Sequence, residues 1–249
     1  MGKHYAQIAD TLTSSLRLSQ PPVAVCFTDS LPASVPRYKG QAPAGCRFWQ
    51  DGATLSFATS STDHALCTIG VYTHNLEQSP AQQTDLMDAL KVFGDLGYIT
   101  PKDLPLIPVL ASRPRYVVYS PLSQSPLAPG VVLLVVDAGQ TLILSEAVQQ
   151  VENRNAPAMG RPACAVIPQV MNTGRAALSL GCCGARAYVD VLTDNVVFAL
   201  PGASLETYAQ RVQVLSEANS VLAKFHQLRR RDVESGRCPT VQDSLSALG

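Results

Sequence analysis

Two dense runs of β-branched and aromatic residues do most to limit the possible folds. They are RYVVYS at 115–120 and VVLLVVD at 131–137, separated by the proline-rich loop PLSQSPLAPG. Such runs are typical of central strands, because these side chains pack well on a pleated surface. PVAVCF at 22–27 predicts another buried strand, entered through a proline. The chain is therefore expected to fold around a sheet.

Helical segments are predicted between and after these strands. Apolar stripes indicate helices over about 4–18 and 82–97, a third helix is expected at about 139–153, and 46–58 has only a weak helical pattern. Short runs near 176–180, 186–191 and 195–200 predict three strands, and a long amphipathic helix is predicted to start near Ser204. We expect a single α+β (mixed α/β) domain over 1–229, with a central sheet of about five to six strands and a long C-terminal helix. Residues 230–249 are expected to form a flexible polar tail.

Charge and composition exclude several classes of partner. Lys plus Arg equals Asp plus Glu, 19 of each, and only 15% of the residues are charged. No overall field then steers the chain toward nucleic acid or an anionic membrane, so a small molecule is the expected partner. The N-terminus has no apolar segment of signal-peptide type, and the apolar run at 130–139 is too short to span a bilayer. We expect a soluble cytoplasmic protein in which seven cysteines are mostly reduced.

The cysteines fall into two groups. Cys26 lies within an apolar strand, where a free thiol behaves as a small hydrophobe, and Cys238 lies in the predicted tail. The other five have small or proline neighbours, which let backbone N–H groups approach sulfur and tune a metal cluster; they are Cys46, Cys67, Cys164, Cys182 and Cys183. Their spacings are long and no Cys-x-x-Cys pair is present. Spacing alone therefore leaves scattered core cysteines as the alternative to a shared metal site.

Several segments together resemble a known family. SLGCCGARAY, GRPACAVIP, FALPG, PPVAVCF and HALCTIGVYTHN are similar to the uncharacterised bacterial and archaeal proteins of the domain of unknown function 169 (ArCR) family. The resemblance covers roughly residues 8–225, and its most specific part is Gly-Cys-x-Gly-x-Arg. It implies a single-domain cytosolic protein with recurring cysteines, which match Cys46, Cys67, Cys164 and Cys182, and an arginine that matches Arg186. Cys183 stands where the family more often has an aliphatic residue, so we expect it to pack in the core.

If these four thiolates converge, they would hold a metal centre, and we expect a 4Fe-4S iron–sulfur cluster with a redox or Lewis-acid role on a small metabolite. A structural zinc ion with four thiolate ligands is the alternative cofactor. Cys182 is the expected ligand of the adjacent pair. Arg186 would offset the thiolate charge or clamp a substrate carboxylate, or it simply pairs with an aspartate or a C-terminal carbonyl.

Two hypotheses need no iron. His64 precedes Cys67 by three residues, which on a helix would place both on one face, so Cys67 could be a nucleophile activated by His64. The third hypothesis is a non-catalytic module that binds a metal or a metabolite, with a structural zinc. The catalytic candidates are accordingly Cys67, His64 and Arg186. The substrate, any redox partner and the oligomeric state do not follow from the sequence.

Overall fold

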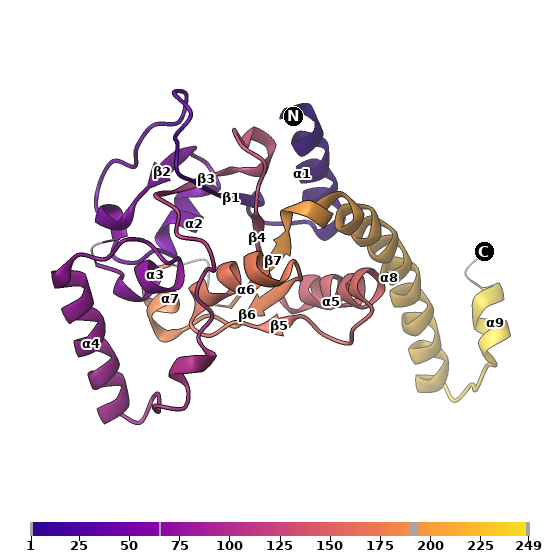
Figure 1. Cartoon of the computed structure of the whole chain (residues 1–249). Coiled ribbons are helices and arrows are strands. Elements are labelled where there is room, and N and C mark those ends of the chain that lie inside the picture. The colour runs from indigo at the N-terminus through magenta and orange to yellow at the C-terminus, as the bar shows by residue number, and fades with distance from the viewer. Residues whose placement is uncertain (1, 65, 190–193, 248–249) are drawn as a thin grey trace.

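The computed structural model describes residues 2–64, 66–189 and 194–247. Its centre is a seven-stranded sheet in the order β2-β3-β1-β4-β7-β6-β5 (Figure 1). The short pair β5–β6 is parallel and the other pairs are antiparallel. The strands are β1 (Val23–Thr28), β2 (Phe57–Thr59), β3 (Tyr116–Pro121), β4 (Val131–Val136), β5 (Ala158–Met159), β6 (Ala177–Ser179) and β7 (Val196–Pro201).

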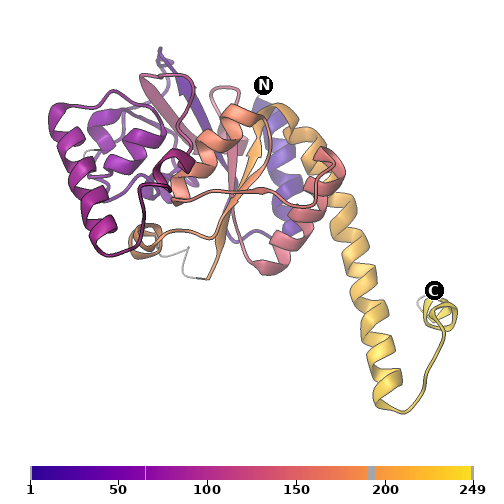
Figure 2. The same ribbon diagram turned by 60° about the horizontal axis from the view of Figure 1, so that its bottom comes forward.

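Three long helices cover one face of the sheet. They are α1 (Gly2–Leu16), α5 (Ala138–Glu152) and the first half of α8 (Leu205–Glu234), which lie together in Figures 1 and 2. Successive strand residues point to opposite faces, so Val132 and Leu134 of β4 meet these helices. They pack with Leu12, Leu144 and Tyr208 in one apolar cluster. We call this side of the sheet the helix face.

Shorter elements cover the opposite face. They are α2 (Arg47–Gly52), α3 (Thr68–Thr73), α6 (Val166–Thr173) and α7 (Cys183–Tyr188), together with the 3-10 turns η1 (Ser61–His64) and η4 (Ala163–Ala165). The helix α4 (Pro80–Asp95) packs outside α3. Further 3-10 turns, η2 (Leu104–Leu106), η3 (Leu122–Gln124) and η6 (Gly202–Ser204), lie in connections. Val25, Tyr119, Leu133 and Val197 point to this side, which we call the thiol face.

The α+β class, the strands at 22–27, 115–120 and 131–137, and the helices at 4–18, 82–97 and 139–153 are confirmed. The sheet has seven strands rather than five or six. The prediction of a strand at 186–191 is wrong, because residues 183–188 form α7; positions 190 and 191 lie outside the described residues. The cause is local: the Cys182 sulfur accepts a hydrogen bond from the Ala185 N–H and so starts a helical turn. The weak helical segment 46–58 divides into α2 and β2.

The C-terminal region departs from the expected polar tail. The helix α8 continues to Glu234, beyond position 230, and α9 (Val241–Ser246) follows a turn. Figure 2 shows the second half of α8 projecting away from the sheet. Leu205, Tyr208 and Val212 anchor its first half in the core, whereas Val221 and Leu222 are exposed. Among the described residues, no helix is both long and apolar enough to cross a membrane.

Candidate functional site

The four cysteines singled out by the sequence gather on the thiol face. Cys46 belongs to the apolar cluster there, and the partly buried Cys67, Cys164 and Cys182 pack against it. They are also electrostatic neighbours: burial, together with the nearby thiols of Cys67 and Cys182, raises the pKa of Cys46 to about 12. Burial likewise raises the pKa of Cys164, with Cys67, Cys182 and Cys46 acting in the same direction. The fold thus brings together side chains that are distant in the sequence.

Each of these cysteines stands at the beginning of a helical segment. Cys46, Cys67 and Cys182 are the N-cap residues of α2, α3 and α7, and Cys164 lies in η4, directly before α6. The first N–H groups of a helix have no partner within it, so they are available to sulfur. The Ala185 N–H donates to the Cys182 sulfur at 3.4 Å. Backbone N–H groups also act on Cys46 and Cys67, where they lower the pKa of the thiols against the larger effect of burial.

Two glycines make room around the Cys67 sulfur. A Cβ atom added at Gly70 would lie 2.9 Å from the Cys67 Sγ and 3.3 Å from the His64 Nδ1. One added at Gly45 would lie 3.6 Å and 3.1 Å from the same two atoms. The glycines thus let two backbone segments approach this sulfur and this imidazole more closely than any larger residue would permit.

Burial dominates the electrostatics of the site. It raises the pKa of Cys67, although the backbone N–H groups of Gly45 and Gly70 act in the opposite direction. The Thr73 hydroxyl donates to the Cys164 sulfur at 3.4 Å, an interaction that favours the thiolate but is outweighed by burial. The thiols with raised pKa are therefore protonated at neutral pH in the metal-free protein. Within the described segments, no three His, Cys, Asp or Glu side chains form a group that already fits a metal ion.

Two buried histidines adjoin the thiols. His64 and His74 are each only 1% exposed, and their rings lie 5.8 Å apart. Burial lowers the pKa of His64 to about 4, and burial together with the neighbouring His64 lowers that of His74 to about 3. Both imidazoles are therefore neutral at pH 7. The His64 Nε2 contacts the Thr59 hydroxyl at 3.3 Å, whereas its Nδ1 and both nitrogens of His74 have no hydrogen-bond partner in the described structure.

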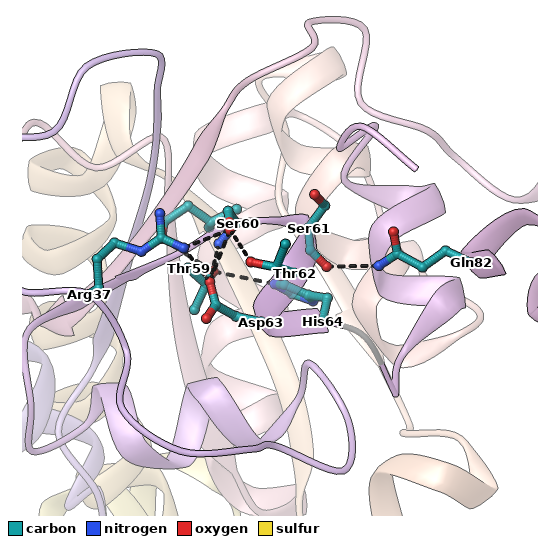
Figure 3. A network of polar contacts seen from close by, with 9 residues as sticks. Arg37, Thr59, Ser60, Ser61, Thr62, Asp63, His64 and Gln82 are labelled. Atoms are coloured by element: carbon teal, nitrogen blue, oxygen red, sulfur yellow. Dashed lines mark hydrogen bonds and ion pairs between the residues drawn. The ribbon is translucent and has the colours of Figure 1, made fainter. Parts of the chain in front are cut away.

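The position of His64 differs from the expected arrangement. His64 ends η1 and Cys67 caps α3, so the two do not share one face of a continuous helix. The carboxylate of Asp63, the residue before His64, binds groups other than the His64 ring. This carboxylate accepts bonds from Arg37 at 2.6 Å and from the Ser60 N–H at 2.7 Å, as Figure 3 shows. Instead, the His64 ring and the Cys67 sulfur lie close to each other because both pack against Gly45 and Gly70.

Sequence reasoning missed Tyr119 as a site residue. It lies in β3, is fully buried, and its hydroxyl has no partner among the described residues. Burial raises its pKa far above 10.0, and the nearby thiols of Cys67, Cys164 and Cys46 act in the same direction. The alternation of β3 could have placed Tyr119 on the same face as Val117, but nothing local indicated which face carries the cysteines.

Three other predicted residues have distinct placements. Cys183 is exposed, so the prediction that it packs in the core is wrong: Cys182 caps α7 and turns inward, which leaves the first residue of the helix outside. Arg186 lies beside Gly181 and donates to the Leu180 carbonyl oxygen. Cys26 is buried in β1 on the other side of the sheet from the four thiols, as expected of a packing residue.

Comparison with known proteins gives one match. The family model described as uncharacterised ArCR, DUF169, matches residues 11–211, which include all four clustered cysteines and Arg186. No curated protein and no solved structure matches the chain. Because the match covers most of the sequence, the chain belongs to the DUF169 family of uncharacterised ArCR proteins.

Proposed function

We propose that this protein is a cytoplasmic metal-binding protein that holds an iron–sulfur cluster of the 4Fe-4S type. Its ligands are the thiolates of Cys46, Cys67, Cys164 and Cys182. The observation that carries the proposal is the gathering of four thiols, each from the start of a different helical segment, on one face of the sheet. The donor set is the one that iron–sulfur clusters take.

The charge balance of the site supports a bound cation. Buried thiols lose their protons only if positive charge compensates the thiolates, and a metal centre supplies that charge while releasing the protons. The backbone N–H groups around Cys67 and Cys182 would then hydrogen-bond to ligand sulfur, an interaction that tunes a cluster. The Tyr119 hydroxyl, which has no hydrogen-bond partner among the described residues, would gain a sulfur acceptor.

A cluster suits the arrangement better than a single zinc ion. Structural zinc sites usually take their ligands from short, closely spaced motifs, and they stabilise small domains that lack a sufficient core. Here the ligands are dispersed over the chain, and two large apolar clusters flank the sheet. Zinc with the same four thiolates remains the alternative cofactor, with a structural role in a non-catalytic module.

The cluster would supply redox chemistry or a Lewis-acidic iron. Cys182 is only partly buried and the adjacent Cys183 is exposed, so this side of the centre would lie near enough to the surface for a small metabolite or a redox partner to reach it. Arg186, in the helix that Cys182 caps, is the proposed residue for a substrate carboxylate. The proposed partner is thus a small molecule or a redox protein, not nucleic acid or a membrane.

The alternative function is a metal-free cysteine enzyme that uses Cys67 with His64. Their shared position against Gly45 and Gly70 favours it. A nucleophilic cysteine, however, needs a thiolate, and a histidine partner stabilises the thiolate as imidazolium. Burial acts against both ions, since it raises the pKa of Cys67 and lowers that of His64. The metal hypothesis is therefore the better supported of the two.

The test compares two adjacent cysteines. Wild-type protein, Cys182→Ser and Cys183→Ser are purified without oxygen, and each sample is assayed for visible absorption, iron, acid-labile sulfide and zinc. We expect visible absorption with iron and sulfide in the wild type and in Cys183→Ser, and their loss in Cys182→Ser. Zinc in place of iron would favour the structural module. A colourless, metal-free protein would overturn the metal proposal and direct attention to Cys67.

A further inference from the structure

A polar hollow lies on the outer side of η1. It has a volume of about 430 Å³, within the range of small-molecule sites. Three arginines supply most of its charge. The lining residues are Arg37, Ser60, Ser61, Glu77, Arg113, Pro114, Arg115 and Tyr116.

Two of the three arginines form no ion pair within the described part of the chain. Arg37 is paired with Asp63 at 2.6 Å and also donates to the Ser60 hydroxyl at 2.7 Å. In contrast, Arg113 and Arg115 form no ion pair with a carboxylate of the described residues. Glu77 forms no ion pair with a described basic side chain. The walls of one hollow therefore carry two uncompensated guanidinium groups beside a single carboxylate.

The wall that carries these arginines is held in place. The Arg115 N–H donates to the Asp29 carboxylate at 3.1 Å, and the Pro114 between the two arginines is buried. The guanidinium groups of Arg37 and Arg115 lie over the Tyr116 ring, 5.1 Å and 5.7 Å from its centre. These contacts hold the Arg115 segment and the guanidinium groups of Arg37 and Arg115 before any ligand arrives, which lowers the entropic cost of binding.

We propose that this hollow binds a small metabolite through a carboxylate or phosphate group, held by Arg113 and Arg115. Guanidinium groups recognise both oxyanions in a bidentate manner, and the anion would neutralise two like charges that otherwise repel each other. The carboxylate of Glu77 would accept a hydrogen bond from a hydroxyl or amino group on the same ligand. The expected ligand therefore carries an oxyanion and a hydrogen-bond donor.

The hollow and the thiol face are joined by one short segment. In Figure 3, Arg37 and Asp63 lie on one side of η1 and His64 extends from the other end of the turn. The Cys67 N–H donates to the His64 carbonyl oxygen at 2.8 Å, so the same turn leads to the cysteine. A ligand in the hollow would rest on the segment that positions His64 and Cys67. The anion site itself does not depend on the metal proposal.

The test is calorimetric titration of the protein, as purified without oxygen, with inorganic phosphate and separately with succinate, at constant ionic strength. We expect saturable binding of at least one anion, and about tenfold weaker binding in each of Arg113→Gln and Arg115→Gln. Binding of phosphate alone assigns a phosphoryl group, and binding of succinate alone assigns a carboxylate. The absence of binding by both anions would overturn the proposal.

Two controls separate the site from general charge effects. Arg211→Gln removes an exposed arginine of α8 that forms no ion pair among the described residues, and it should bind as the wild type does. Arg115→Lys keeps the charge but removes the bidentate geometry, and should bind more weakly than wild type. Equal weakening in Arg211→Gln would overturn the proposal. The titration is repeated after metal removal. Because the anion site does not depend on the metal centre, anion binding should be unchanged, so a failure of the metal proposal would leave it intact.

Discussion

The two faces of the sheet are built from the same strands but collect different kinds of side chain. On the helix face, α1, α5 and α8 cover an almost wholly aliphatic and aromatic cluster. On the thiol face, short helical segments bring in four thiols and two neutral histidines, and β3 adds a tyrosine hydroxyl that has no partner among the described residues. Buried polar atoms without partners cost free energy, so these polar groups offset part of the stability that the apolar contacts of the thiol face provide. Both faces bury large apolar clusters, and the helix face does so without this set of polar groups.

The largest expected effect lies on the helix face. Phe198 in β7 is fully buried there, and Phe198→Ala should lower the free energy of unfolding by about 3–5 kcal/mol, because it leaves a cavity in a close-packed cluster. Urea titration of the folded protein measures the loss. The metal content per folded chain should remain that of the wild type. A loss in the free energy of unfolding below about 1 kcal/mol would contradict close packing of this cluster.

The next effect belongs to the histidines of the thiol face. Both pKa values are lowered from 6.5, to about 4 for His64 and about 3 for His74. Between pH 6.5 and the pKa values of the folded protein, these histidines are protonated in the unfolded chain but neutral in the folded one. The free energy of unfolding therefore falls as the pH falls. From pH 7.5 to 5, metal-free protein should lose about 2 kcal/mol for each histidine. In His74→Phe the loss over this range should shrink by one histidine's share, and an unchanged pH dependence would contradict the assignment.

A smaller effect is expected where the glycines approach Cys67. Gly70→Ala places a methyl group 2.9 Å from the Cys67 Sγ, so it should destabilise the protein by about 1–3 kcal/mol. Gly94→Ala is the matched control, since this glycine of α4 has no atom within 4 Å of the added Cβ. It should stabilise the protein by up to about 1 kcal/mol through helix propensity. Equal effects of the two substitutions, measured by thermal unfolding, would argue against close packing at Gly70.

The smallest change in stability is expected for Tyr119→Phe. The hydroxyl that it removes has no partner in the described part of the structure, so the free energy of unfolding of the metal-free protein should change by less than about 1 kcal/mol or rise slightly. In the loaded protein, loss of a hydrogen-bond donor near ligand sulfur should lower the reduction potential of the centre. Redox titration checks this second effect. An unchanged potential would place the hydroxyl away from the cluster.

Local patterns predicted most of the fold. The β-branched runs at 115–120 and 131–137 form strands because pleated, buried surfaces select those side chains. The prediction failed at 186–191, where a short apolar run was read without the hydrogen bond that the Cys182 sulfur accepts. Such a cap depends on the geometry at Gly181, whose φ of +85° no alternation pattern reveals. The same geometry decides that Cys182 is covered and Cys183 is exposed.

The site was predictable only in part. Small neighbours and the family resemblance singled out the four cysteines, but their convergence depends on how helices far apart in sequence pack on one face of the sheet. Tyr119 and the arginine hollow were missed for the same reason, because residues from several segments make each environment. His64 was found by its spacing from Cys67, although a turn and two glycines, rather than one helix face, bring them together.

The most direct test of the central claim is the iron X-ray absorption spectrum of protein purified without oxygen. If Cys46, Cys67, Cys164 and Cys182 hold a cluster and the neutral histidines stay unligated, the iron will show sulfur as its only nearest neighbours and further iron atoms beyond them. Nitrogen ligands at the iron would instead assign His64 or His74 to the metal. A protein that contains no iron would contradict the account.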